Sequence, residues 1–324
     1  MSMMFEYSAV VRTLGQAGAK YQRLLDSLAS QTVRPREILV YIAEGYPLPN
    51  ETIGVEQYKY VKKGMVAQRA LSLDEVRTEW VLFLDDDVYL PSNAVERLYD
   101  ELIQNQGQII APCTFYNHKQ PARAKLAKFI TGKELCILHS KRWAYKVTRT
   151  AGFAYNNNPV SSVYESQTNA GPCFLCRKSD FLAINFSEEL WLDKTYYALP
   201  EDQVMFYKMY KRGFKVLTSF DSGIVHLDAG TTMQSDSERD CKLVYSEYRN
   251  KLIFWHRFIY LPDRNAISRF MSIIALAYSL VIQSIKHLLR YFLGKGALSR
   301  AFFAGLKEGL VVLKSSEYKS LSLI

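Results

Sequence analysis

The chain has 324 residues, of which 48% are hydrophobic and 23% charged, and this ordinary globular composition excludes a disordered or fibrous chain. At about 150 residues per domain, the length predicts one large domain or two modest ones. The five Cys residues lack the spacing of a disulfide framework, and no apolar signal-like stretch follows Met1, so we expect a reduced, cytoplasmic protein.

The net charge of +9 is unevenly distributed along the chain. Nine basic residues and one acidic residue lie between Lys119 and Arg149, and eleven basic and three acidic residues lie between Lys251 and Ile324. The remainder of the chain is neutral to acidic. Two basic segments on such a body favour an anionic partner, such as lipid headgroups, a phosphorylated substrate or nucleic acid.

Short apolar runs alternate with helix-like stretches in the N-terminal third of the chain. The predicted strands are residues 7–11, 37–42, 80–84 and 109–115. The predicted helices are residues 19–30, 64–73 and 94–104. Residues 51–60 are polar and poorly periodic. The alternation predicts the α/β class, with a mostly parallel sheet covered by helices.

The alternation stops at residues 117–170, which are first basic and then polar. A long segment of this kind in a compact domain is usually functional or disordered. The elements predicted after it are strands at 171–177, 214–217 and 222–227 and a helix at 200–212.

From Cys241 onward the chain is helical and aromatic. Residues 270–285 are apolar, but Ser and Gln interrupt them, so the run is too short and polar for a confident span of about 20 residues. Basic residues follow among Leu and Phe, which favours an interfacial amphipathic helix. The alternative is a helix that packs on the core or on another subunit.

Three adjacent carboxylates, Asp85, Asp86 and Asp87, directly follow the apolar run 80–84. Such a run is typical of a strand buried on both faces, and sheets of this class bind ligands at the carboxyl ends of their strands. The carboxylates repel one another, and Mg²⁺ or Mn²⁺ takes carboxylate oxygens together with substrate phosphates. The alternative is a solvated acidic turn before a helix N-cap at Ser92.

The acidic triplet is one of several motifs that occur in a fixed order between about Tyr7 and about Leu227. With these motifs and spacings, the chain resembles family 2 glycosyltransferases of the GT-A fold. The motifs are Ser8–Thr13, Leu24–Thr32, Pro35–Val40, Phe83–Val88, Gly171–Arg177, Pro200–Asp202, Lys211–Val216 and Val225–His226.

The resemblance implies roles for two groups of acids. Asp85 and Asp87 match the DxD motif, so Asp87, with Asp85, is expected to ligate Mg²⁺ or Mn²⁺ at the donor's diphosphate, while Asp85 and Asp86 reach the ribose and metal-bound water. Asp202 matches the catalytic base of inverting members, and Glu201 is expected to contact the acceptor. The alternative for both Glu201 and Asp202 is that they only complement the dipole of helix 200–212.

Four further residues match the family's donor site less closely. His226 is expected to be a metal or diphosphate ligand, or else a structural His. Arg69 is a candidate diphosphate contact, although Ala70 stands where relatives carry Asn. Glu44 stands where relatives use Asp to read the base, and Thr13 is a second candidate for the base pocket.

Other residues have two interpretations each. Trp191 could be an aromatic platform for a sugar ring or a core residue. Cys173 and Cys176 have CxxC spacing without a second pair, so we expect buried core thiols rather than a metal or redox site. The basic segment between Lys119 and Arg149 interleaves with aromatics but has no nucleic-acid motif, so we expect a lid that faces a membrane or a lipid diphosphate and no nucleic-acid partner.

Together these features predict an inverting, metal-dependent glycosyltransferase of cell-surface polysaccharide synthesis on the cytoplasmic face of the membrane. Its partners are a nucleotide-diphosphate-sugar, UDP-sugar favoured and dTDP-sugar possible, a glycan or lipid-linked acceptor hydroxyl and an anionic membrane surface. The predicted domains are residues 1–240, with a nucleotide-sugar half to about 115 and an acceptor half to 240, and a helical region 241–324. The rival functions are a nucleotidyltransferase and a non-catalytic nucleotide-sugar-binding or membrane-scaffold protein.

Overall fold

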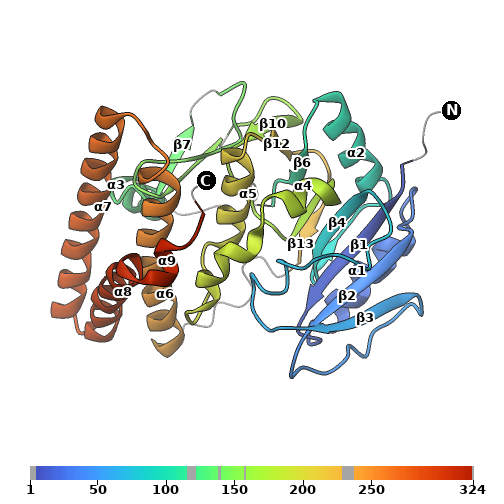
Figure 1. Cartoon of the computed structure of the whole chain (residues 1–324), viewed down its shortest axis with the longest axis horizontal. Coiled ribbons are helices and arrows are strands. Elements are labelled where there is room, and N and C mark those ends of the chain that lie inside the picture. The colour runs from blue at the N-terminus through green and yellow to red at the C-terminus, as the bar shows by residue number, and fades with distance from the viewer. Residues whose placement is uncertain (1–4, 115–121, 138–139, 157, 228–236, 323–324) are drawn as a thin grey trace.

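The computed structural model describes residues 5–114, 122–137, 140–156, 158–227 and 237–322. Its main sheet has eight strands in the order β10-β12-β6-β11-β4-β1-β2-β3 (Figure 1). The strands are β1 (Tyr7–Thr13), β2 (Glu37–Ala43), β3 (Glu56–Val61), β4 (Trp80–Asp85), β6 (Ile109–Pro112), β10 (Val163–Ser166), β11 (Cys173–Arg177) and β12 (Val216–Ser219).

The four strands β3, β2, β1 and β4 are mutually parallel, and β12 is parallel to β6. The strand β11 runs antiparallel between β4 and β6, and β10 is antiparallel to β12. The predicted α/β architecture, a mostly parallel sheet flanked by helices with a helical C-terminal extension, is confirmed. The parallel register pairs Arg12 of β1 with Asp85 of β4, so both side chains reach the same edge of the sheet.

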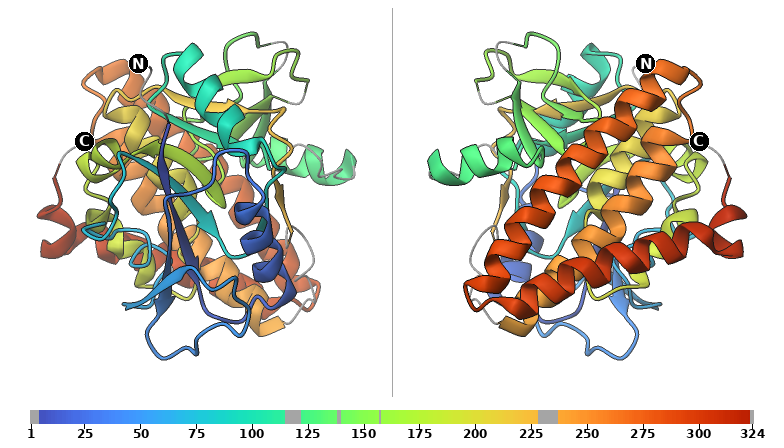
Figure 2. Two further views of the ribbon diagram at one scale, coloured as in Figure 1. Left: turned by 90° about the vertical axis from the view of Figure 1, so that its right-hand side faces the viewer. Right: turned by 90° about the vertical axis from the view of Figure 1, so that its left-hand side faces the viewer.

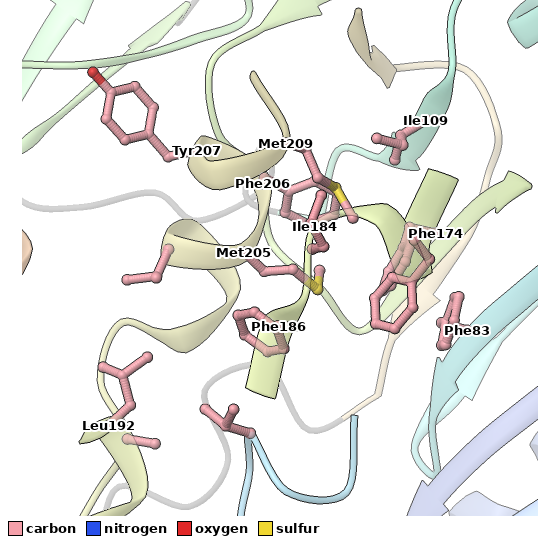
Figure 3. Packing of buried hydrophobic residues seen from close by; sticks show 14 of the residues in the cluster. Phe83, Ile109, Phe174, Ile184, Phe186, Leu192, Met205, Phe206, Tyr207 and Met209 are labelled. Atoms are coloured by element: carbon pink, nitrogen blue, oxygen red, sulfur yellow. The ribbon is translucent and has the colours of Figure 1, made fainter. Parts of the chain in front are cut away.

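Two hydrophobic clusters cover the two faces of the sheet, because successive strand residues point to opposite sides. Leu82 and Leu84 pack with helices α1 (Ala19–Ala29) and α2 (Ala94–Gln104). Phe83 packs on the other face with Phe174 and with residues of α5 (Glu201–Lys211), as Figure 3 shows. The helix predicted at 94–104 is confirmed to the residue.

The segment predicted as an irregular excursion is partly folded. It contains α3 (Ala122–Ile130) and a small sheet of β7 (Glu134–Ile137), β9 (Phe153–Asn156) and β8 (Tyr145–Val147). Residues 115–121, 138–139 and 157 of this segment lie outside the described part of the chain.

The C-terminal region packs against the sheet domain. Its helices are α6 (Ser237–Phe254), η2 (Trp255–Tyr260), α7 (Ala266–Phe292), α8 (Gly296–Lys314) and α9 (Ser316–Lys319). Phe254 and Phe258 belong to the same buried cluster as Phe83, and α5 lies between the sheet and these helices in Figure 1. The helix α6 also runs through residue 240, where the sequence predicted a domain boundary.

Two element predictions were wrong. Residues 64–73 form turns rather than a helix, and Leu73 has a φ of 57°, which ends any helical path. The Asp193 carboxylate accepts hydrogen bonds from the backbone N–H groups of Val66 and Ala67, at 3.1 and 2.9 Å, and so holds these turns in place. The strand β3 was missed because four of its six residues are exposed at the edge of the sheet, which removes the apolar period.

Candidate active site

A cavity of about 580 Å³ opens at the carboxyl ends of β1 and β4. This is the edge at which open α/β sheets bind ligands. Its lining residues are Arg12, Thr13, Leu14, Gln16, Ala17, Lys20, Met65, Gln68, Asp85, Asp86, Asp87 and His226.

The first carboxylate of the acidic triplet, Asp85, is held by Arg12. The Arg12 Nε donates to Asp85 Oδ1 at 2.5 Å and its Nη2 donates to Oδ2 at 3.1 Å. The same guanidinium donates through Nη1 to Glu201 Oε1 at 2.8 Å, and its Nη2 lies 3.9 Å from Asp202 Oδ1. Arg12 therefore joins the end of β4 to the first turn of α5.

The other two carboxylates of the triplet have different partners. Asp86 accepts a hydrogen bond from the Thr13 hydroxyl, and burial is the main cause that raises the pKa of Asp86 to about 6. Asp87 Oδ1 lies 3.0 Å from His226 Nε2, because β5 (Val88–Tyr89) pairs with β13 (Val225–His226) directly beyond the triplet. The three neighbours therefore point to three separate parts of the site.

Arg69 joins the triplet to the predicted base. Its Nη1 donates to Asp202 Oδ1 and lies 3.3 Å from Glu201 Oε1, and its Nη2 lies 3.5 Å from Asp85 Oδ1. The Nη2 group also donates to the carbonyl oxygen of Gly171 at 2.8 Å. Arg69 and Arg12 thus bring Asp202 close to Asp85, the first residue of the triplet, although Asp202 itself does not line the cavity.

Charge in this cluster is unbalanced, since three buried or partly buried carboxylates share two guanidiniums. Burial and the neighbouring Asp202 raise the pKa of Glu201 to about 7. Burial also opposes ionisation of Asp202, but Arg69 and Arg12 outweigh it and lower the pKa of Asp202 to about 2. Asp202 is therefore ionised at neutral pH, although its side chain is only 21% exposed.

The backbone before β11 leaves room for this cluster. A β-carbon on Gly171 would clash with the Asp202 carboxylate and would lie 2.8 Å from Arg69 Nη1. Glycine at this position therefore permits the close approach of Asp202 and Arg69.

Two predicted site residues lie elsewhere. Glu44 is exposed in the turn after β2, does not line the cavity, and its backbone N–H donates to the carbonyl oxygen of Val61 at 2.8 Å. Trp191 lies in η1 (Phe186–Asp193), 6% exposed, where its Nε1 donates to Glu189 Oε2 at 2.7 Å. These positions support the core interpretation of Trp191 and give Glu44 no contact with the cavity.

The sequence analysis missed Arg12, Gln68 and Gly171 as site residues. Gln68 Nε2 donates to the carbonyl oxygen of Thr13 at 3.0 Å and lines the cavity. Arg12 precedes Thr13 at the end of the predicted first strand, and this position at a strand end is the one sequence signal for it.

The Cys pair behaves as predicted. Cys173 and Cys176 are free thiols, both fully buried in β11, and they face opposite clusters of the core. Burial raises the pKa of both thiols, so neither is a reactive thiolate.

Comparison with known proteins supports the resemblance over part of the chain. The model of the family described as Glycosyl transferase family 2 matches residues 55–181. Residues 55–181 therefore resemble family 2 glycosyl transferases, and we refer to them as the family 2 segment. It contains the acidic triplet, Arg69 and Gly171 and supports a glycosyl transfer function, whereas Asp202 and His226 lie beyond it.

Comparisons with curated proteins and with solved structures give weaker information than the family match. No curated protein matches the chain. Among solved structures, the chain is similar to the crystal structure of GalNAc-T7 with UDP, GalNAc and Mn²⁺, with 12% identity and a TM-score of 0.49 over 79% of this chain. The match covers 48% of that protein's chain, so this chain spans about half its length.

The family 2 segment and its neighbours have donors that suit a hard divalent ion. Within the described ranges, no three His, Cys, Asp or Glu side chains are already grouped as a metal site. Asp87 and His226 lie side by side and partly exposed at the cavity, and a carboxylate with an imidazole suits Mn²⁺ or Mg²⁺. Both oxygens of Asp85 are bonded by Arg12, so Asp85 fits a metal less well than Asp87 does.

Proposed function

We propose that this chain is an inverting, metal-dependent glycosyltransferase. It moves a sugar from a nucleotide-diphosphate-sugar to a hydroxyl of a glycan or lipid-linked saccharide, in cell-surface polysaccharide synthesis. The observation that carries the proposal is the bridge by Arg69 between Asp202 and Asp85, which brings a candidate base and a candidate donor site together.

The proposed reaction is a single displacement. The acceptor oxygen attacks the anomeric carbon of the donor sugar, its proton passes to a carboxylate oxygen of Asp202, and the bond from that carbon to the diphosphate oxygen breaks. One ionised carboxylate is enough for this step, and Asp202 is kept ionised by Arg69 and Arg12. Since the same guanidiniums weaken it as a base, Asp202 needs Arg69 to loosen its hydrogen bond when substrates bind.

The cavity at β1 and β4 is the proposed donor site. Its volume of about 580 Å³ is within the usual range of small-molecule sites. Thr13 ends β1, and the Gln68 side chain donates to its carbonyl oxygen, so the base and ribose of the donor would lie beside these two residues. Asp85 and Asp86 are proposed to contact the ribose. Arg69 is proposed to contact the diphosphate, with a UDP-sugar as the favoured donor.

A divalent cation is part of the proposal, because carboxylates outnumber guanidiniums at the site and the donor adds further negative charge. Asp87 and His226 are the residues that would hold Mn²⁺ or Mg²⁺. A metal bound there stabilises the negative charge that develops on the leaving diphosphate.

Membrane attachment is proposed from helix α7, which is apolar outward and polar inward. Ser272, Ser279 and Gln283 are at most 1% exposed, whereas Phe270 and Val281 are 61% and 56% exposed. Of the described helices, α7 alone is long and apolar enough to cross a membrane. Since these polar residues are buried against the protein and the apolar residues face outward, we propose that the outer face of α7 lies on the cytoplasmic surface of a bilayer.

Thermal stability in the presence of nucleotide sugars tests the proposed function. A ligand that binds only the folded state raises apparent stability in proportion to ln(1 + [L]/Kd). UDP-sugars and dTDP-sugars are compared with and without Mn²⁺ or Mg²⁺, and we expect at least one to raise Tm only when metal is present. No metal-dependent stabilisation by any member of the panel would contradict the proposal.

A further inference from the structure

A second cavity lies beside the residues that lead into the helix of the proposed base. It has a volume of about 260 Å³, below the roughly 300 Å³ of the smallest usual ligand pockets, so it suits part of a molecule such as a headgroup. Its lining residues are Lys128, Lys133, Glu134, Ala151, Gly152, Phe153, Tyr155, Leu199, Pro200, Glu247, Lys251 and Phe254.

The wall of this cavity combines apolar surface with an excess of positive charge. Lys128 pairs with Glu134 at 2.5 Å, and Lys133 pairs with Glu247 at 2.6 Å. The third lysine, Lys251, has no carboxylate within ion-pair distance among the residues that the structure describes. Two ion pairs and one further ammonium leave the cavity with a positive charge that suits an anion.

Of the three lysines, Lys251 gives the strongest indication that an anion binds in this cavity. It is 6% exposed, and its Nζ donates one hydrogen bond, to the Ser279 hydroxyl at 3.1 Å, although an ammonium has three donors. Burial is the main cause that lowers the pKa of Lys251 to about 8. A buried cation with spare donors is costly unless an anion approaches it, and binding of one would restore its usual ionisation.

The surroundings of the cavity indicate which kind of anion fits. On one side, Leu199 and Pro200 directly precede Glu201 and Asp202 in the chain. On the other side, Ser279 of α7 donates to the carbonyl oxygen of Thr131, at the end of α3, at 2.8 Å.

Exposed apolar residues continue outward from that second side. On α3 they include Phe129, 60% exposed, and on α7 they include Phe270 and Ile274. Figure 2 shows α3 projecting beside the face that α7 and α8 form. An anion in the cavity could thus extend a hydrocarbon chain over this apolar surface and a sugar toward Asp202.

We propose that this cavity binds the phosphate of an acceptor in which a saccharide is linked through phosphate to a hydrocarbon chain. Lys251 and the paired Lys128 and Lys133 contact the phosphate, while Phe153 and Phe254 contact the first carbons of the chain. The inference rests on the proposed function, since it identifies the class of acceptor for the same transfer reaction.

Binding of farnesyl monophosphate in buffer with EDTA tests the inference, because metal-dependent binding at the acidic triplet is then absent. Titration calorimetry is expected to show saturable binding to the wild-type protein. Charge-assisted hydrogen bonds are worth about 1.5 to 3 kcal/mol, so Lys251→Met should weaken binding about tenfold or more. Inorganic phosphate and farnesol, which each carry half of the ligand, should both bind much more weakly.

A matched control is available on the same helix. Lys242 of α6 is exposed, pairs with Glu238 and does not line the cavity, so Lys242→Met should bind the probe like the wild type. Since Met replaces a buried ammonium, we expect Lys251→Met to fold. Lys133→Met, at a side chain that is 37% exposed, provides a second variant and should also weaken binding.

The outcomes separate this inference from the proposed function. Equal binding to the wild type and to both cavity variants, absence of binding, or inorganic phosphate binding as tightly as farnesyl monophosphate would overturn it. Stabilisation by a nucleotide sugar with Mn²⁺ is measured on the same proteins and should be unchanged by Lys251→Met. If no nucleotide sugar with Mn²⁺ stabilises the wild type, the proposed donor site is refuted, but the result for lysine-dependent binding of farnesyl monophosphate still stands.

Discussion

At the scale of single residues, two guanidiniums determine the charge and shape of the candidate site. Arg12 and Arg69 together contact Asp85, Glu201 and Asp202, which come from distant parts of the chain. Because three carboxylates compete for two cations, one of them holds its proton more tightly than usual. Burial favours Glu201 for this role.

The raised pKa of Glu201 predicts a pH dependence of stability. Between pH 4.5, the ordinary pKa of a Glu, and about 7, the folded protein binds a proton at Glu201 that the unfolded chain has lost. Stability contributed by this proton is therefore present below pH 4.5 and lost as pH rises toward 7. Urea unfolding at pH 5, 6 and 7 should show the wild type losing stability relative to Glu201→Gln, and parallel curves would contradict the assignment.

Residue positions at the site could be predicted where they follow strand ends. The triplet, Thr13 and Asp202 each lie next to a predicted element; the triplet and Thr13 line the cavity, and Arg69 connects Asp202 to Asp85. Arg12 could not be assigned, because its role depends on the register of β1 against β4, which the sequence alone does not specify. Trp191 was ambiguous because a buried aromatic and a sugar platform have the same local sequence pattern.

At the scale of elements, a buried ion network ties η1, α5 and the C-terminal region together. Glu189 is fully buried, and its Oε1 accepts from Lys208 Nζ at 2.8 Å and from Arg257 Nη2 at 2.9 Å. Lys208 lies on α5, the helix that carries Asp202, and Arg257 lies on η2. The network thus holds α5, the helix of the proposed base, against the C-terminal helices.

Replacement of Glu189 should destabilise the fold strongly. In Glu189→Gln, Lys208 and Arg257 lose their buried counter-charge, and breaking such a pair costs about 3–5 kcal/mol. Glu188→Gln is the matched control, because Glu188 contacts the same two cations but its side chain is 16% exposed. Urea unfolding should show a much larger loss for Glu189→Gln, and equal losses would show that burial of the network is not what matters.

Element prediction succeeded where apolar periodicity was strong, as in α2 and β4. It failed at β3, whose exposed side chains have no period, and at residues 64–73, whose turns are held by a tertiary contact from Asp193. Such a contact, 126 or more residues away along the chain, has no local signal.

At the scale of the whole molecule, the proposed donor cavity, the proposed base and the apolar helical face follow one another across the protein. The sheet carries the proposed donor cavity and α5 carries Asp202. The helix α7 lies on the outside of the molecule in Figure 2, and its exposed residues, such as Phe270, are apolar. The helices α7 and α8 also carry basic residues, among them Lys286 and Arg290 of α7 and Arg300 of α8. An apolar surface with basic neighbours suits an anionic bilayer.

Binding to lipid vesicles tests this arrangement. The wild type should sediment with phosphatidylglycerol-containing vesicles and less with pure phosphatidylcholine, and Phe270→Glu with Ile274→Glu should abolish sedimentation. Leu48→Glu with Val55→Glu is the control, since both residues are exposed and lie between β2 and β3 in the chain, and these strands lie on the opposite side of the molecule from α7 in Figure 1. Equal sedimentation of the two double variants would place the membrane contact elsewhere.

The central claim is that the triplet and Asp202 act on one donor. The most direct measurement is metal-dependent sugar transfer or donor hydrolysis by Asp202→Asn, with donor binding followed by thermal stabilisation of the same sample. The account predicts that Asp202→Asn loses turnover while it still binds donor with metal, and that Asp87→Asn loses the metal-dependent binding itself. Near-normal turnover by Asp202→Asn would contradict the account.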